Sequence, residues 1–387
     1  MERRKILVIG MLDSIHLARW LEQFSDQKID FYMFPSKKFK YLNSDLLRLL
    51  KSSGVANYRL ARPYIAFKYI GFLNEIARIV FNKFDQDIQL TLLNRVLLNN
   101  KFMYVHAIEI QGAGYLYGSL PRSILDQNKL IITNYGSDIL YFRNFPEHAS
   151  KIRSILEIAK YYSGECQRDY ELAITNNFTG TFLPCIPNAG GFNSEIFTMN
   201  VTPSKYRNLI IAKCYGGMFG LGGLIIDALN TFLKTRPSVQ VLLYSVTDDL
   251  ISQVEMLKFN FSNQITYYRV RDKVERKVFL EYFSRARLYI GASRSDGIST
   301  SFLESLCLGA YAIQTNTSCG NEWLDRGFIA TLVQPRLSSL IMELDRYDDT
   351  RMLEKARVMN LLLSQKFLND KVIKDEALKF YRLDKQL

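Results

Sequence analysis

Two carboxylates, Asp296 and Glu304, lie eight positions apart in the stretch ASRSDGISTSFLESLCLGAYAIQT, residues 292–315. Glu304 falls in the first turn of a predicted helix. Ser301 and Glu304 could therefore form a capping box, in which each side chain accepts a hydrogen bond from the other residue's backbone N–H. A cap accounts neither for Asp296 nor for the loop 297–301, whose N–H groups at a helix start would attract a phosphate. A helix cap and a ligand site both stay open on spacing alone.

Alternating strands and helices must position this stretch. Apolar runs bounded by polar residues predict buried strands, and longer stretches with apolar residues every three or four positions predict helices. In the first half we expect strands at 5–11, 28–34, 101–109 and 129–136, with a helix near 14–23. In the second half we expect strands at 207–217, 239–246, 264–270, 288–293 and 310–315, with helices near 224–235, 248–258 and 274–286. This order is typical of parallel sheets that bind ligands at the carboxyl ends of their strands.

The chain of 387 residues suits two domains. We expect two doubly wound α/β domains, 1–185 and 207–365, joined by a linker at 186–206 that is rich in Pro, Gly, Asn, Ser and Thr. A long final helix, roughly 353–381, is expected to cross back, so that 366–387 reach the first domain.

Composition excludes several classes of protein. A hydrophobic content of 48% with 23% charged residues is that of a globular protein, and no run of about 18 apolar residues could span a membrane, so we expect a cytoplasmic protein. The five cysteines have no metal-ligand spacing, and we expect no metal.

The net charge of +12 favours an anionic partner. The basic, aromatic-rich stretch 36–83 could lie on an anionic bilayer, or it could be a solvated helix face over a core, and both interpretations stay open.

The stretch SRSDGISTSFLESLCLGAYAIQT resembles the acid-x7-acid signature of family 4 retaining glycosyltransferases, E-G-x-x-x-x-x-L-E-A-x-A-x-G-x-P-V-I. The acids, Gly297, Leu303, Gly309 and the following strand fall at matching offsets. RNLIIAKCYGGMFGLGG also stands where this family opens its second domain, TNYGSD where it closes its first sheet, and SIHLARWLE is common in its polysaccharide members. The resemblance covers nearly the whole chain. It implies a GT-B fold, in which two Rossmann-like domains face a central cleft, and a metal-independent transferase that needs no cofactor besides a nucleotide-diphosphate sugar.

The resemblance also implies roles for residues of the second domain. Glu304 would bind the ribose hydroxyls, while Asp296 and the amides of Gly297, Ile298 and Ser299 would hold the transferred sugar. Lys213 would be a phosphate-binding cation, although it could equally be an ordinary lysine at a strand end. The family's second cation, six positions later, is replaced by Phe219. Arg294 could compensate, and so could an anion nest formed by the amides of Gly220, Gly222 and Gly223.

The first domain would supply the acceptor side. Gly10 ends the first strand and would let the backbone approach a ligand. Asp13, Ser14 and His16 follow it, although Asp13 or Ser14 could simply cap the helix. His106 and Glu109 match the family's H-x-x-E element, with a satisfied core histidine as the alternative. Tyr135 stands where many relatives have a histidine that contacts the sugar, and Asp138 would orient a sugar or acceptor hydroxyl or cap the next helix.

We therefore expect a retaining transferase that moves a sugar to a saccharide acceptor. The acceptor is expected to be lipid-linked, at the inner face of the cytoplasmic membrane, in bacterial-type cell-surface polysaccharide or glycolipid synthesis. A GT-B nucleotide-sugar epimerase and a non-catalytic binder of nucleic acid or another polyanion are the alternatives. We see no base-reading motif that favours the binder. A dinucleotide-dependent dehydrogenase is disfavoured because GMLDSI after the first strand lacks G-x-G-x-x-G.

Overall fold

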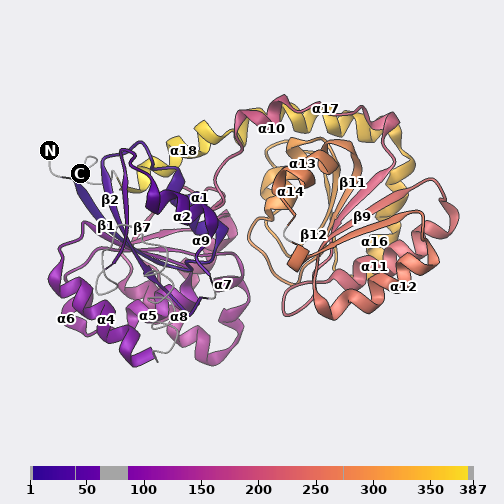
Figure 1. Cartoon of the computed structure of the whole chain (residues 1–387). Helices are drawn as coiled ribbons and strands as arrows, with labels where there is room; N and C mark the ends of the chain where they lie inside the picture. The colour runs from indigo at the N-terminus through magenta and orange to yellow at the C-terminus, as the bar shows by residue number, and fades with distance from the viewer. Residues whose placement is uncertain (1–2, 40, 62–85, 273, 382–387) are drawn as a thin grey trace. The chain divides into compact units, whose positions relative to one another are not determined.

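The structure is a computed structural model that describes residues 3–39, 41–61, 86–272 and 274–381. The chain divides into two compact units. Unit 1 comprises Met1–Gly190 with Ile373–Leu387, and unit 2 comprises Gly191–Val372. Each unit is a parallel sheet with helices on both faces (Figure 1). The predicted fold class, α/β with two doubly wound parallel sheets, is confirmed.

The sheet of unit 1 has the strand order β3-β2-β1-β4-β5-β6-β7, and its paired strands are parallel. Its strands are β1 (Arg4–Gly10), β2 (Ile29–Pro35), β3 (Asn57–Leu60), β4 (Tyr104–Ile108), β5 (Leu130–Thr133), β6 (Tyr161–Ser163) and β7 (Thr181–Phe182). Its helices are α1 (Ile15–Glu22), α2 (Ser44–Lys51), α4 (Gln86–Asn99), α5 (Tyr115–Gly118), α6 (Arg122–Leu125), α7 (Ser137–Leu140), α8 (Pro146–Ile158) and α9 (Gln167–Thr175).

Strand β1 is apolar throughout because both faces of its sheet are covered. Alternate residues of a strand point to opposite faces. Ile6 and Val8 accordingly pack in one hydrophobic cluster with α1 and α2, whereas Leu7 and Ile9 pack in a second cluster with α4, α5 and α8.

Unit 2 repeats this pattern with the strand order β10-β9-β8-β11-β12-β13. Its strands are β8 (Leu209–Lys213), β9 (Gln240–Val246), β10 (Ile265–Arg269), β11 (Ala286–Gly291), β12 (Tyr311–Thr315) and β13 (Thr331–Val333). Its helices are α10 (Ser194–Thr198), α11 (Gly222–Phe232), α12 (Ile251–Asn260), α13 (Arg276–Arg285), α14 (Thr300–Cys307), α15 (Asn321–Leu324), α16 (Leu337–Leu344) and α17 (Thr350–Phe367).

Both strand orders place a topological switch point in the middle of the sheet. In unit 1 the chain order reverses between β1 and β4, and in unit 2 it reverses between β8 and β11. Open α/β sheets bind ligands beyond the carboxyl ends of the strands at such points. Lys213, the last residue of β8, pairs with Gly291, the last residue of β11, so the loops that follow both strands start side by side.

The single final helix predicted over 353–381 is wrong. Helix α17 ends at Phe367, and α18 (Asp370–Leu378) starts after a break and runs from unit 2 into unit 1. At the break, Asn369 pairs with Phe192, and its side-chain oxygen accepts a hydrogen bond from the Lys371 N–H at 2.9 Å. Asparagine favours such a cap because its side chain competes for backbone donors.

Within the part of the chain that the structure describes, no helix combines the length and the hydropathy that a membrane crossing requires.

Candidate functional site

Two loops of unit 2 are joined directly beyond the β8 and β11 strand ends. Gly220 pairs with Ser293, and the Arg294 N–H donates to the Phe219 carbonyl at 2.8 Å. These contacts bring the loop that follows Lys213 against the loop that contains Asp296. The predicted donor-binding residues of unit 2 therefore gather at its switch point.

The predicted anion nest is not formed at Gly220 and Gly222. The Gly220 N–H donates to the Gly216 carbonyl at 3.2 Å, and the Gly222 N–H donates to the Tyr215 carbonyl at 2.8 Å. A Cβ at position 220 would lie 2.5 Å from the Gly216 carbonyl oxygen. Glycine is thus required at 220 for a tight turn, and the prediction that its amide binds an anion is wrong in this conformation.

Helix α14 is capped by Ser299. Its side chain accepts a hydrogen bond from the Phe302 N–H at 3.4 Å. Ser301 lies inside the helix, so the capping box of Ser301 with Glu304 is not formed. The backbone N–H groups of Gly297, Ile298 and Ser299 have no acceptor among the described residues.

Glu304 is held by an arginine that sequence reasoning missed. Nε and Nη2 of Arg276 both lie 2.8 Å from Glu304 Oε1. The Glu304 side chain is 10% exposed and that of Arg276 is 42% exposed. Among the described residues, Arg276 is the only hydrogen-bond partner of this carboxylate, which leaves Oε2 available. The sequence signal for Arg276 was weak, because it is one basic residue of several at the start of a predicted helix.

A buried tyrosine connects the two acids. Burial raises the pKa of Tyr289, and the negative charges of Asp296 and Glu304 raise it further, whereas a hydrogen bond to Ser299 lowers it. Burial and the negative charge of Asp296 also raise the pKa of Tyr215. Asp296, Ser299 and Glu304 therefore surround one pair of tyrosines.

Lys213 lies beside Tyr215, one of these two tyrosines. Its Nζ is 5.0 Å from the centroid of the Tyr215 ring, and within the described residues it has no carboxylate partner. Arg294 is exposed on the adjoining loop. Unit 2 thus presents two cations and three donor amides around Asp296 and Glu304, as a site for a diphosphate and a polyol would require.

Unit 1 has its own polar cluster, centred on Glu109 at the end of β4. Glu109 has φ 88° and ψ 144°, a conformation that strains a residue with a side chain. The next segment, Ile110–Gly114, winds as a π-helix. Ser36 donates a hydrogen bond to Glu109 Oε1 at 2.7 Å, and burial raises the pKa of Glu109. Backbone strain of this kind persists where the surrounding structure enforces it, often at functional sites.

Asp138 connects the loops that follow β4 and β5. Its Oδ2 accepts hydrogen bonds from the N–H groups of Ile110 at 2.9 Å and Tyr135 at 3.0 Å. Burial and the negative charge of Glu109 raise the pKa of Asp138 to about 8. Asp138 is therefore a largely protonated acid at neutral pH and can donate a hydrogen bond.

The other predicted acceptor-side residues lie near this cluster. Ser14 caps α1 by accepting a hydrogen bond from the His16 N–H at 3.2 Å, and it also bonds to the side chain of Tyr135. The rings of His16 and Tyr135 are 5.9 Å apart. The negative charge of Asp13 contributes to the raised pKa of Glu109.

A pocket of about 580 Å³ opens beside Glu109. Its lining includes Ser36 and Lys37, which follow β2, Gly112, which follows β4, and Lys151 and Ser154 of α8.

Two predicted residues of unit 1, Gly10 and His106, have structural explanations. A Cβ at Gly10 would meet Leu17 Cδ2 at 3.4 Å, which is an ordinary contact with a core side chain, so the backbone needs no glycine there. His106 is fully buried, and its two ring nitrogens bond to the Tyr381 hydroxyl at 2.7 Å and to Thr133 Oγ1 at 2.6 Å. Burial lowers the pKa of His106 to about 3. These surroundings support the satisfied core histidine rather than a catalytic role.

No protein-family model matches the chain, and no curated protein matches its sequence. Solved structures do match over its full length. HepE from Anabaena, in complex with UDP and glucose, has a TM-score of 0.68 and 12% identity over 98% of this chain and 99% of its own. A glycosyltransferase from Rickettsia africae has a TM-score of 0.68 and 13% identity over 99% and 98%. Sucrose-phosphate synthase from Thermosynechococcus elongatus has a TM-score of 0.67 and 14% identity over 99% of each chain. The chain therefore has the two-domain GT-B fold of these glycosyltransferases.

Proposed function

We propose that this protein is a retaining, metal-independent glycosyltransferase of family 4 that transfers a sugar from a nucleotide-diphosphate sugar. The observation that carries the proposal is the arrangement around Glu304 in unit 2. Arg276 holds one carboxylate oxygen, the other is available, and Asp296, Lys213 and three donor amides lie around the same switch point.

Each of these groups has a task in such a transfer. The Glu304 Oε2 accepts hydrogen bonds from the two ribose hydroxyls of the donor. Lys213 and Arg294 neutralise the diphosphate, on which negative charge develops as the sugar departs. Asp296 and the N–H groups of Gly297–Ser299 hold the sugar. The departing phosphate oxygen then takes the acceptor's proton on the same face, so the protein positions and stabilises rather than reacts covalently. HepE binds UDP and UDP-glucose, which supports a uridine nucleotide as the first donor to test.

Unit 1 would receive the acceptor. Asp138 donates a hydrogen bond to a sugar hydroxyl in its protonated form, and Glu109 accepts one. The neighbouring pocket, with Lys37 at its rim, takes the saccharide of a lipid-linked acceptor in cell-surface polysaccharide or glycolipid synthesis.

Membrane attachment through 36–83 stays a prediction, and within this stretch 40 and 62–83 lie outside the described residues. In the described part, Leu46 and Leu49 of α2 are buried in the core, and Arg48 pairs with Glu22 at 2.9 Å. These contacts support a solvated helix face for α2.

Calorimetric titration with UDP, GDP, ADP and CMP tests the proposal. One diphosphate should bind in the micromolar range. Glu304→Ala should weaken it at least about 100-fold, because two hydrogen bonds to a charged group are lost. Glu281→Ala is the matched control, since Glu281 is an exposed acid on α13. The proposal fails if no diphosphate binds, or if Glu304→Ala binds as tightly as the wild type.

A further inference from the structure

Helix α17 exposes large apolar side chains between basic ones. Val358, Met359 and Leu362 are 44%, 38% and 61% exposed. Arg351, Lys355 and Lys366 are exposed on the same helix. With 3.6 residues per turn, these six side chains fall within an arc of about 100°. We name these six residues the α17 stripe.

The side chains of the α17 stripe are not part of the hydrophobic core of unit 2. Leu353, Ala356, Asn360 and Ser364 are buried and form the inward face of α17. The Asn360 amide exchanges two hydrogen bonds of 2.8 Å with the backbone of Ile329, which fixes the rotation of the helix. The stripe therefore points away from the core of unit 2, and in the described structure its apolar members stay in contact with solvent.

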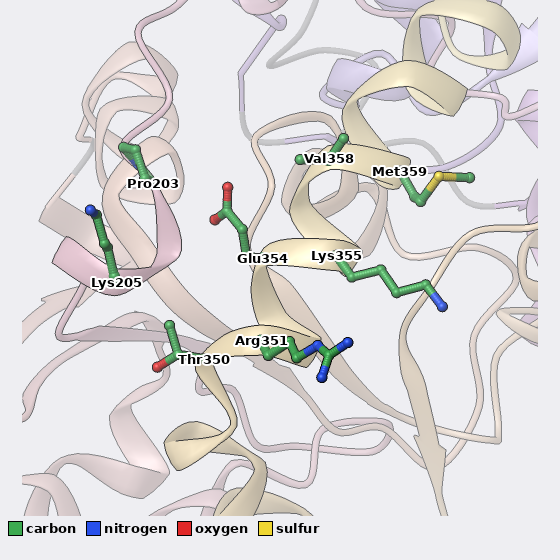
Figure 2. Close-up of a pocket in the computed structure, with 8 residues that line it drawn as sticks. All are labelled: Pro203, Lys205, Thr350, Arg351, Glu354, Lys355, Val358 and Met359. Atoms are coloured by element: carbon green, nitrogen blue, oxygen red, sulfur yellow. The ribbon is translucent and has the colours of Figure 1, made fainter.

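A hollow of about 790 Å³ lies beside the amino-terminal half of the stripe. Residues of α17 line it together with Lys205 of the short helix η3 (Ser204–Tyr206). Figure 2 shows Arg351, Lys355 and Met359 extending from one side of α17. Tyr206, next to Lys205, is 69% exposed. Basic and apolar groups thus continue from the stripe onto η3.

The charge of this surface is positive. Glu354 is the one acid among the eight residues that line the hollow. It is already bonded to Arg357, at 3.0 Å from Nε to Oε2, and to the Ser204 N–H at 2.9 Å. Lys205, Arg351 and Lys355 are left without an acidic partner among the described residues.

We propose that the α17 stripe, together with Lys205 and Tyr206, docks on an anionic lipid bilayer. Lysine and arginine bind lipid phosphates, while an apolar group between them enters the boundary of the acyl chains. A soluble polyanion would satisfy the cations but would leave Val358, Met359 and Leu362 in water. The mixture of both kinds of group on one face therefore matches a charged lipid surface.

Sedimentation of the full-length protein with vesicles tests this proposal. The vesicles are phosphatidylcholine with or without phosphatidylglycerol, at low salt. The first variant is Arg351→Gln with Lys355→Gln, and the second is Val358→Ser with Leu362→Ser. The matched control is Met256→Ser with Lys258→Gln on α12, where Met256 is 64% exposed. Thermal unfolding and nucleotide binding are measured on the same samples.

The wild type should bind only vesicles that contain phosphatidylglycerol. The basic pair of substitutions should weaken binding about 30-fold, since two cations near the surface are lost. The apolar pair should weaken it as well, and the control should bind as the wild type. Absence of vesicle binding by the wild type overturns the proposal. The proposal is also overturned if both stripe variants bind vesicles as tightly as the wild type. It is overturned as well if the basic pair of substitutions weakens binding but the apolar pair does not, because that result would indicate a polyanion site. Nucleotide affinity should be unchanged in all variants. A negative result in the vesicle experiment would therefore not count against the proposed transfer reaction.

Discussion

Replacing Arg276 tests whether this arginine positions Glu304 or binds the nucleotide itself. Arg276→Gln removes the two contacts of 2.8 Å to Glu304 Oε1 and the positive charge, while it keeps a polar, though shorter, side chain. If Arg276 acts through Glu304, the carboxylate loses its fixed orientation and must be ordered each time a nucleotide binds.

The magnitude follows from the geometry. A hydrogen bond to a charged group contributes about 1.5–3 kcal/mol when buried. The Arg276 side chain is 42% exposed, so solvent screening reduces the contribution of the whole ion pair to about 1 kcal/mol. Ordering a free carboxylate side chain costs a similar amount, about 0.5–1.5 kcal/mol. Arg276→Gln should therefore weaken UDP binding about fivefold to tenfold, far less than Glu304→Ala.

A double-mutant cycle, with UDP affinity measured by isothermal titration calorimetry, gives the coupling between Arg276 and Glu304. The samples are the wild type, Arg276→Gln, Glu304→Ala and the double variant, with Arg285→Gln as the matched control because Arg285 is exposed on the same helix. In the Glu304→Ala background, Arg276→Gln should have no further effect on affinity. A further loss in that background would refute the reasoning, because it would mean that Arg276 contacts the nucleotide directly. An unchanged affinity of Arg276→Gln in the wild-type background would refute it equally.

Three further predictions concern unit 1. Gly112→Ala should lower the free energy of unfolding by about 1–3 kcal/mol, because the new Cβ would meet the Glu109 carboxyl carbon at 3.0 Å and Ser36 Oγ at 3.2 Å. Urea unfolding measures this, with Gly54→Ala as a control whose Cβ has no neighbour closer than 3.6 Å, and equal stabilities would contradict it. Burial raises the pKa of Asp138 to about 8 from its ordinary value of 3.8, so the folded state binds the proton more tightly, and the stability from this group is lost as pH rises from about 4 through 8. Urea midpoints over this range should fall more steeply in the wild type than in Asp138→Asn, and parallel profiles would exclude the linkage. The pKa of His106 is lowered to about 3 from 6.5, so its contribution to stability is present above pH 6.5 and lost as pH falls below it. His106→Gln should lower the melting temperature and leave UDP affinity unchanged, whereas a stable variant that no longer transfers sugar would restore the catalytic interpretation.

Local signals in the sequence were sufficient for most of the architecture. Apolar runs such as Lys5–Gly10 predicted strands because a parallel sheet buries both faces. The strands that were not predicted, β3, β6, β7 and β13, are short, with at most four residues each, and therefore carry little periodicity. The break between α17 and α18 was missed because Asn369 acts through its pairing with Phe192, which no local pattern reveals.

The sequence by itself determined which chemical groups stand at or just after the strand ends, among them Asp296, Glu304 and Lys213, because each group's distance from its strand is set by its position along the chain. Only the tertiary structure decided which of them meet. The partner of Glu304 is Arg276, 28 residues away, and one of the two partners of His106 is Tyr381, 275 residues away. The physical reason is that burial and pairing depend on which strand ends become neighbours when the sheet forms. This also explains why Asp138 gains a raised pKa only once the loops after β4 and β5 enclose it beside Glu109.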